Sequence, residues 1–261
     1  MKRITSAENP QYRALLKLAQ SSRERRKAGL SLLDGIHLVA AYCERFGRPL
    51  QIAVSESVLH EVEVKQTLAA VHPLEPLLLS EGLFTTLSTV STPTGIMASI
   101  RTPRAPALPA RLGACLLLED IQDPGNLGSI LRSAAGAGIT QICLSKHSVH
   151  SWSPRVLRAG MGAHFMLEIH EQCDLEEIAR NFDGHVIVTR QHAKKSVFEI
   201  DLTGTVALVF GNEGAGVSPA LQAIAHESVA IPMPGKVESL NVAAAAAICL
   251  FERVRQLRAG V

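Results

Sequence analysis

The chain has 261 residues, of which 47% are hydrophobic, 4% aromatic and 19% charged. This length suits two domains or one large α/β domain, and the composition excludes general disorder. The longest uncharged apolar run, residues 242–251, is too short to span a membrane, and the basic N-terminus lacks the apolar segment of a signal peptide. The five cysteines form no C-x-x-C pair, so we expect no disulfide framework, no metal site and a cytoplasmic location.

The net charge of +2 conceals an uneven distribution. Residues 1–50 carry ten Lys and Arg against four Asp and Glu, whereas residues 51–100 carry one against five. A basic cluster of this kind is suited to nucleic-acid phosphates, because each neutralised phosphate releases condensed counterions. A solvated helix end is the alternative, and charge alone does not choose between the two. The basic excess peaks at Arg23, Arg25, Arg26 and Lys27.

A proline-rich stretch at residues 101–113 divides the chain. Proline lacks a backbone donor and restricts the residue before it, and the stretch shows neither helical nor strand periodicity. We therefore expect an extended linker between a domain at residues 1–100 and a second domain at residues 114–261.

The first domain is predicted to be a small α/β unit. Apolar residues recur at helical spacing in two segments, and short apolar runs of the kind found in strands lie between probable helices. The histidines of this half show no metal-ligand spacing. The expected helices are residues 10–27 and 36–46, and the expected strands are residues 30–33, 50–54, 77–79 and 96–100.

In the second domain, short apolar runs alternate with helical segments, which indicates a mainly parallel sheet. The runs are continuously apolar, as expected where helices cover both faces. A helix from about residue 240 to 257 closes the chain, with Ser239 as a candidate cap. The expected strands are residues 115–118, 141–144, 165–169, 186–189, 206–210 and 229–231.

Residues 118–132 are the first of three segments that carry chemistry. A strand ends in a Pro-Gly turn, and Asn126 stands where a helix should begin, so a helix cap is its simplest role. Arg132 lies in an apolar stretch of that helix. Its guanidinium needs a partner there, unless the side chain extends to solvent.

The second segment, residues 209–218, reads Val-Phe-Gly-Asn-Glu-Gly-Ala-Gly-Val-Ser. Its three glycines follow a buried type of strand and precede a helix, a context in which a ligand approaches the backbone at the carboxyl end of a sheet. The spacing G-x-x-G-x-G matches neither the dinucleotide fingerprint nor a P-loop. Glu213 is suited to a cationic ligand, an arginine or a salt bridge to a helix.

The third segment, residues 231–241, combines two prolines and a glycine in an irregular loop. Ser239 and Asn241 then open a helix that starts with Val242 and five alanines. Such small side chains let another backbone pack closely. Taken alone, Ser239 has the sequence context of an ordinary helix cap.

The order and spacing of the three segments resemble the signature motifs of the SpoU/TrmH family of RNA ribose 2′-O-methyltransferases. The match spans residues 115–252. The basic N-terminal part is similar to the family's appended substrate-binding domain. The resemblance implies an α/β fold class: a small N-terminal L30-like RNA-binding domain, followed by a C-terminal SPOUT α/β domain with a deep trefoil knot.

The resemblance also implies S-adenosylmethionine as the methyl donor, RNA as the partner, and a homodimer with the active site near the subunit interface. The N-terminal basic cluster defined above would contact RNA. The implied cofactor-binding residues are Thr189, Gly211, Ile231 and Leu240. The implied catalytic residue is Arg132, and the residues that position it or the RNA are Asn126, Glu213, Ser239 and Asn241.

A sulfonium methyl is already activated, so the enzyme must align a ribose 2′-oxygen with it and remove the proton of that oxygen. A guanidinium, with a pKa above about 12, is a poor base. Three roles stay open for Arg132: a base deprotonated in a special pocket, a stabiliser of the developing alkoxide, or a clamp for a substrate phosphate that takes the proton. On chemical grounds we favour electrostatic stabilisation.

The predicted function is therefore methylation of a ribose 2′-hydroxyl, a group that DNA lacks. Ribosomal RNA is favoured because the appended domain suits a large structured RNA. One alternative is a tRNA ribose 2′-O-methyltransferase, and another is a non-catalytic RNA-binding protein that keeps the fold, against which the intact motif residues argue. A dinucleotide-dependent oxidoreductase is less favoured, since the glycine spacing is wrong.

Overall fold

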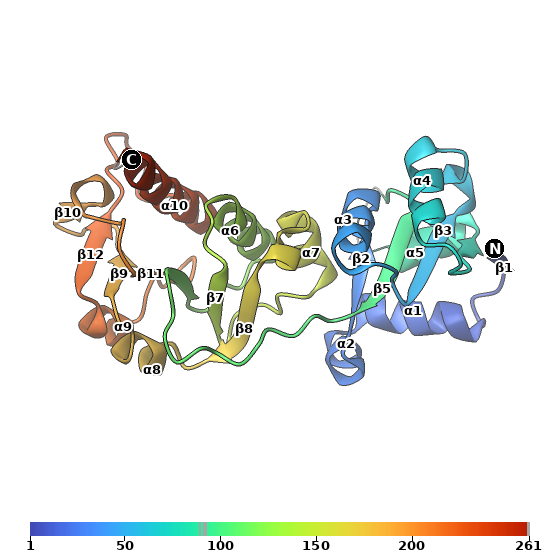
Figure 1. Ribbon diagram of the computed structural model, residues 1–261, viewed down its shortest axis with the longest axis horizontal. Helices are drawn as coiled ribbons and strands as arrows, with labels where there is room; N and C mark the ends of the chain where they lie inside the picture. Colours follow the sequence, from blue (N-terminus) through green and yellow to red (C-terminus); the bar gives the residue numbers. More distant parts are fainter. Residues whose placement is uncertain (89, 91–92, 260–261) are drawn as a thin grey trace. The chain divides into compact units, whose positions relative to one another are not determined.

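The computed structural model describes residues 1–88, 90 and 93–259, so the last two residues of the expected second domain lie outside it. Its contacts divide the chain into two compact units. The first unit comprises Met1–Pro103 and Trp152–Phe165, and the second comprises Arg104–Ser151 and Met166–Val261. Each unit contains its own sheet (Figure 1). No helix in the described part of the chain is long and apolar enough to cross a membrane.

The first unit is built on a five-stranded sheet in the order β1-β4-β3-β5-β2, in which β5 runs antiparallel to both of its neighbours. The strands are β1 (Lys2–Ile4), β2 (Leu30–Asp34), β3 (Gln51–Ser55), β4 (Leu77–Leu79) and β5 (Ile96–Arg101). The helices are α1 (Pro10–Gln20), α2 (Ser22–Ala28), α3 (Ile36–Phe46), α4 (Val62–Ala70), α5 (Glu81–Leu87) and α7 (Pro154–Gly160), and 3₁₀ turns occur at η1 (Glu56–Val58) and η2 (Ala163–Met166).

The expected helix over residues 10–27 is two helices, α1 and α2. The chain is extended at Ser21, which separates them, and the Ser21 hydroxyl accepts a hydrogen bond from the backbone N–H of Glu24 at 3.2 Å. A serine that satisfies a free N–H in this way starts a new helix, and this explains the break.

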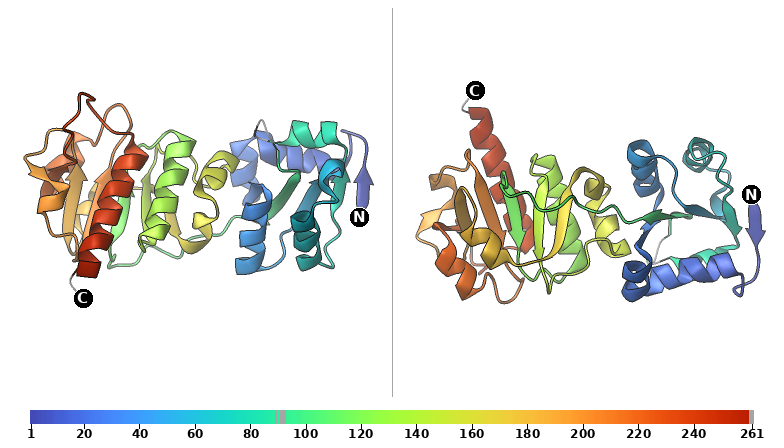
Figure 2. Two further views of the ribbon diagram at one scale, coloured as in Figure 1. Left: turned by 90° about the horizontal axis from the view of Figure 1, so that it is seen from above. Right: turned by 60° about the horizontal axis from the view of Figure 1, so that its bottom comes forward.

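Strand alternation gives the first unit two cores. Leu32 and Met97 belong to a cluster with α1 and α5, whereas their neighbours Leu33 and Ile96 belong to a cluster with α3 and α4. Successive strand side chains point to opposite faces, so the sheet is covered on both sides. The views in Figure 2 show helices on the two faces.

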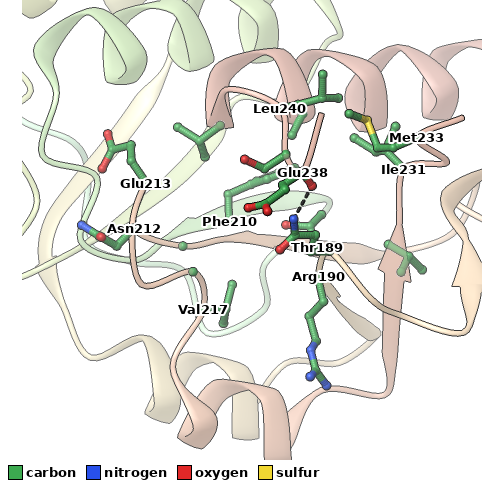
Figure 3. A pocket seen from close by; sticks show the side chains of 17 residues that line it. Thr189, Arg190, Phe210, Asn212, Glu213, Val217, Ile231, Met233, Glu238 and Leu240 are labelled. Carbon is green, nitrogen blue, oxygen red and sulfur yellow. Dashed lines mark hydrogen bonds between the residues drawn. The ribbon is translucent and has the colours of Figure 1, made fainter. Parts of the chain in front are cut away.

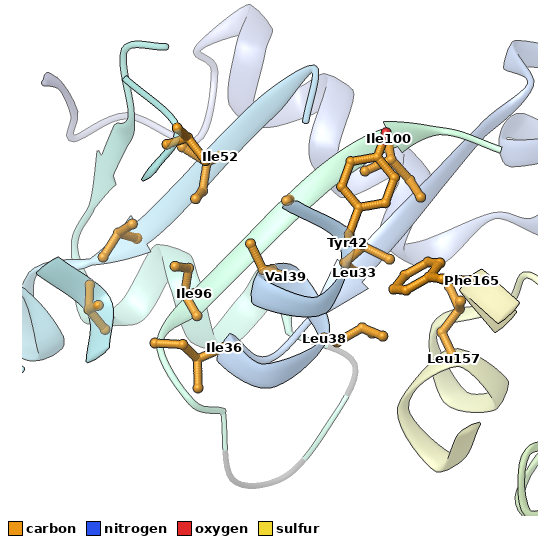
Figure 4. Packing of buried hydrophobic residues seen from close by; sticks show 14 of the residues in the cluster. Leu33, Ile36, Leu38, Val39, Tyr42, Ile52, Ile96, Ile100, Leu157 and Phe165 are labelled. Atoms are coloured by element: carbon orange, nitrogen blue, oxygen red, sulfur yellow. The ribbon is translucent and has the colours of Figure 1, made fainter. Parts of the chain in front are cut away.

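The second of these clusters explains why residues 152–165 belong to the first unit. Leu157 and Phe165 pack beside Leu33 and Tyr42 (Figure 4), and the rings of Tyr42 and Phe165 meet edge to face with their centroids 5.6 Å apart. The sequence prediction placed this segment in the second domain and used Phe165 to begin a strand. Phe165 is instead 6% exposed in the first unit's core, and the strand begins at Glu168.

The second unit has a seven-stranded sheet in the order β10-β12-β9-β11-β6-β7-β8, and every pair in it is parallel. In Figure 1, α6 and α10 lie on one side of this sheet and α8 and α9 on the other. The strands are β6 (Cys115–Leu118), β7 (Gln141–Ser145), β8 (Glu168–Cys173), β9 (His185–Thr189), β10 (Lys195–Ser196), β11 (Val206–Phe210) and β12 (Glu227–Ala230). The helices are α6 (Pro124–Gly136), α8 (Leu175–Arg180), α9 (Pro219–Ile224), α10 (Val242–Ala259) and the 3₁₀ turn η3 (Val197–Glu199).

The α/β class and the parallel sheet are thereby confirmed. The central strands β6 and β11 are buried at every residue, because helices cover both faces. The carboxyl ends of parallel strands meet at one edge, and the three sequence segments leave the sheet directly from the ends of β6, β11 and β12. The trefoil knot stays a prediction.

Candidate active site

A pocket lies where β9, β11 and β12 end and α10 begins (Figure 3). The carboxyl edge of a parallel sheet is the usual ligand-binding position in α/β folds. All four residues expected to bind a cofactor line this pocket, and so do two of the residues expected to position the reaction. They are Thr189, Gly211, Ile231, Leu240, Glu213 and Ser239.

The loop that follows β11 is folded tightly on itself. The backbone groups of Asn212 and Gly216 exchange two hydrogen bonds of 2.9 and 3.0 Å, and the Asn212 side-chain oxygen accepts from the N–H groups of Gly214 and Ala215. A Cβ atom at Gly211 would overlap with the backbone of Gly216. Glycine is therefore required at position 211 because two backbone segments cross there.

Glu213 connects this loop to the start of α6. Its carboxylate accepts hydrogen bonds from the side chain of Asn126 at 3.0 Å and from the backbone N–H groups of Asp123 at 3.2 Å and Gln122 at 3.4 Å. Partial burial raises the pKa of Glu213, but these hydrogen bonds outweigh it and leave the pKa below its usual range. Glu213 is therefore held as an anion that orients Asn126.

Asn241 brings the third sequence segment into the same network. Its side-chain oxygen accepts from the N–H groups of Ala243 and Ala244, so its amide nitrogen is left to donate to the side-chain oxygen of Asn126 at 2.8 Å. Asn126 in turn directs its own nitrogen to Glu213. The three motifs thus meet through three side chains, and the network determines the amide orientations of Asn126 and Asn241.

The structure corrects two expected helix caps. Asp123, not Asn126, caps α6 by accepting from the N–H of Asn126 at 2.8 Å. Asn241, not Ser239, provides the cap of α10. Asn126 is consequently free to use its side chain in the network, and among the described residues the hydroxyl of Ser239 makes no hydrogen bond, although it faces the pocket.

Arg132 lies on α6, exposed, and does not line the pocket. Its guanidinium makes no hydrogen bond or ion pair with any described residue. Of the two outcomes left open by the sequence, the side chain therefore extends to solvent. This position leaves Arg132 available to a substrate or to a second chain.

One of the four residues of the basic cluster, Arg25, is buried. Arg25 is 6% exposed, and its guanidinium donates to the backbone carbonyls of Leu18 and Ala19 at the end of α1. Burial lowers the pKa of Arg25, and the neighbouring charge of Arg26 lowers it further. The side chain of Arg25 joins α1 and α2 and is therefore not exposed in the way that an RNA contact requires. Arg23, Arg26 and Lys27 are exposed.

Sequence reasoning missed several residues that line the pocket, among them Arg190, Gln191, Met233 and Glu238. The side chain of Gln191 donates to the carbonyl of Glu238, which links the loop after β9 to the third segment. Arg190 and Gln191 could have been predicted from their position, because they immediately follow a strand whose end was expected to bind a cofactor.

Together, these features define an α/β protein with a ligand pocket at the carboxyl edge of a parallel sheet and a second small α/β unit. Residues 113–251 match the SpoU rRNA Methylase family, and residues 9–98 match the MRM3-like substrate binding domain. The chain belongs to the SpoU rRNA methylase family. The resemblance seen in the three sequence segments is thus confirmed.

Several known proteins and solved structures are similar over nearly the whole chain. An uncharacterized tRNA/rRNA methyltransferase of Synechocystis is 36% identical, with 97% of this chain and 93% of that protein covered. The 23S rRNA (guanosine(2553)-2′-O)-methyltransferase RlmP of Bacillus subtilis is 31% identical, with 96% and 98% covered. The crystal structure of an RNA 2′-O ribose methyltransferase has a TM-score of 0.86 at 30% identity, with 97% and 98% covered. The SpoU methyltransferase AviRb from Streptomyces viridochromogenes, solved with AdoMet, has a TM-score of 0.82 at 26% identity, with 97% and 100% covered.

Proposed function

We propose that this chain transfers a methyl group from S-adenosylmethionine to a ribose 2′-oxygen of ribosomal RNA. The observation that supports this most is the convergence of the three motifs. Glu213, Asn126 and Asn241 form one hydrogen-bonded chain beside a pocket that the second and third motifs line. Family membership and the relatives named for rRNA methylation agree with this assignment and favour rRNA over tRNA.

The residues of the pocket fit S-adenosylmethionine. The apolar side chains of Ile231, Met233 and Leu240 offer a surface for a heteroaromatic base, and the close backbone crossing at Gly211 lets a ligand approach main-chain groups. No metal is required, because the donor supplies an activated sulfonium methyl when bound. The described residues contain no cluster of three or more side chains suited to holding a metal ion.

The chain's own task is then alignment and charge stabilisation. Alignment of the reacting groups can supply about 7–11 kcal/mol of the barrier. The network through Glu213 and Asn126 fixes the start of α6, the helix that carries Arg132. In the proposed mechanism Arg132 stabilises the negative charge that develops on the 2′-oxygen. Because Arg132 is outside the pocket of its own chain, we further propose a homodimer with the active site near the subunit interface.

The decisive experiment is incubation of the protein with labelled S-adenosylmethionine and unmodified total RNA, followed by alkaline hydrolysis. A 2′-O-methyl group blocks cleavage at its own linkage, so we expect label in an alkali-resistant dinucleotide derived from rRNA. Label confined to bases would contradict the ribose assignment, and label in tRNA alone would favour the alternative substrate. The absence of any transfer would support an RNA-binding protein without activity. We also propose a cytoplasmic location, where this substrate would be found.

The exposed residues of the basic cluster lead to a prediction about RNA affinity. Replacing Arg23, Arg26 and Lys27 by glutamine should reduce the slope of log K against log salt by about 2 to 3, since each phosphate contact contributes about 0.7–0.9. Binding of S-adenosylhomocysteine should not change. The measurement is a salt titration of RNA binding, with Lys65→Gln on α4 as a single-charge control. An unaltered slope would show that the cluster is only a solvated helix face.

The carboxylate of Glu213 leads to a prediction about pH. Its pKa is lowered in the folded state, so its contribution to stability is present above the unfolded pKa of about 4.3 and is lost as pH falls through the lower folded pKa. Glu213→Gln should therefore lower the melting temperature at pH 7, and the difference from the unmodified protein should shrink at acid pH. Thermal unfolding of both proteins between pH 7 and 3 measures this. A difference that is constant with pH would mean that the charge has no part in the network.

A further inference from the structure

Arg190 is the one cationic side chain among the residues that line the pocket. Its backbone is held firmly, because its N–H donates to the carbonyl of Val229 at 2.8 Å, and the hydroxyl of the preceding Thr189 donates to the carbonyl of Val209 at 3.1 Å. The guanidinium itself is exposed and makes no hydrogen bond or ion pair with any described residue. The chain therefore fixes the base of this side chain at the pocket and leaves its charged end unused.

The two amide side chains at the pocket are already engaged. The side chain of Asn212 donates to the carbonyl of Asp120 at 2.9 Å, and that of Gln191 donates to the carbonyl of Glu238. Glu213 and Glu238 are anions and would repel a carboxylate. An anionic ligand group that enters the pocket thus finds a free cationic side chain only at Arg190 among the lining residues, with the hydroxyl of Ser239 as the remaining free side-chain donor.

The apolar and the cationic side chains of the pocket lie in different places. In Figure 3, Ile231, Met233 and Leu240 lie together at one side, and the side chain of Arg190 extends from the end of β9 away from them. The proposed donor has the same polarity, with a flat apolar base at one end and an amino-acid group at the other. A base placed on the apolar side would direct the amino-acid end toward the guanidinium.

We infer that Arg190 binds the carboxylate of the methionine portion of S-adenosylmethionine and so makes the pocket selective for donors with an intact amino-acid end. The inference rests on the proposed function and adds a residue to it. A guanidinium presents two parallel N–H groups that match the two oxygens of a carboxylate, whereas the ammonium group of a lysine does not. The alternatives are that Arg190 contacts an RNA phosphate at the mouth of the pocket or has only a structural role.

The test combines a change in the protein with a change in the ligand, both read by calorimetry. S-adenosylhomocysteine carries the carboxylate and cannot react, and its decarboxylated analogue differs only in lacking that group. Arg190→Gln should weaken S-adenosylhomocysteine binding by about 10- to 100-fold, the usual range for a hydrogen bond to a charged group, and change binding of the analogue by less than about twofold. Arg190→Lys should recover part of the lost affinity.

Lys194→Gln is the matched control, because it removes one positive charge from the same loop at a residue that does not line the pocket. It should leave both affinities unchanged, and unaltered melting temperatures would exclude misfolding. Equal losses on both ligands in Arg190→Gln would indicate a structural role, and no loss on either would indicate an RNA contact or a solvated side chain. Both results would overturn the inference while leaving the proposed function in place. If the unmodified protein bound neither ligand, the proposed donor would be wrong as well.

Discussion

Arg132→Ala is expected to lower kcat for methyl transfer by about 100- to 1,000-fold, the range found when one group that stabilises a developing oxyanion is removed. Its dissociation constant for S-adenosylhomocysteine should stay within about twofold of the unmodified protein. The reason is the position of Arg132: the side chain is exposed on α6 and does not line the pocket. Single-turnover kinetics and calorimetry measure the two quantities separately.

A parallel loss of donor affinity would contradict this separation, because it would require Arg132 to act through the pocket. Arg132→Lys then distinguishes the three roles. Lysine keeps the positive charge but lacks the fork of two N–H groups, so substantial retained activity would argue against a bidentate phosphate clamp. A rate that rises with pH through the range of a lysine ammonium would instead favour a base at this position.

Most strands of the second unit were predictable because helices cover both faces of the sheet, and this makes them continuously apolar in the sequence. The two-residue strand β10 (Lys195–Ser196) was not predicted, because it has no apolar run. The strand β8 is a second, more informative exception. Phe165 belongs to an apolar run near β8, but it is part of the first unit, where its side chain packs beside Tyr42, and β8 itself starts at Glu168 with a partly polar pattern. Apolar runs alone do not tell whether a hydrophobic residue belongs to a half-exposed edge strand or packs into a different core.

The helix caps show a second limit. Asp123 and Asn126 are both good cap residues, and only the hydrogen bond from the N–H of Asn126 to Asp123 tells which of them acts. The same ambiguity affected Ser239 and Asn241. The expected segments were correct, but the cap was assigned to the wrong residue in each, because a cap and a side-chain donor need the same residue types. Asn241 does both, since its side-chain oxygen caps α10 and its nitrogen donates to Asn126.

The pocket residues that the motifs predict, such as Gly211 and Leu240, lie together because each follows or precedes an element that ends at the same edge of the sheet. Arg190 was missed because it lies outside the three segments and no spacing rule marks it. Arg25 was assigned to RNA because charge is visible in the sequence, whereas its burial depends on where α1 ends. Tertiary contacts thus decide which charges of a cluster stay available.

Gly211→Ala is expected to weaken S-adenosylhomocysteine binding by at least about 100-fold and to destabilise the fold by about 1–3 kcal/mol, the usual cost of overpacking. The added Cβ would overlap with the backbone of Gly216, so the loop that Asn212 and Gly216 close by two hydrogen bonds must open or shift. That shift would also displace Glu213, which links the loop to α6. Calorimetry and thermal unfolding provide the measurements.

Gly214→Ala is the matched control in the same loop. A Cβ at Gly214 would lie 3.6 Å from the side-chain oxygen of Asn212, which is an ordinary contact, and its backbone does not have a positive φ. We therefore expect nearly normal donor binding and stability from this variant. If both variants reduced donor binding and stability equally, glycine at position 211 would be needed for the flexibility of the loop and not for the backbone crossing. If both were tolerated, the backbone crossing at Gly211 would not form part of the donor site, and the pocket at the ends of β9, β11 and β12 would need another ligand.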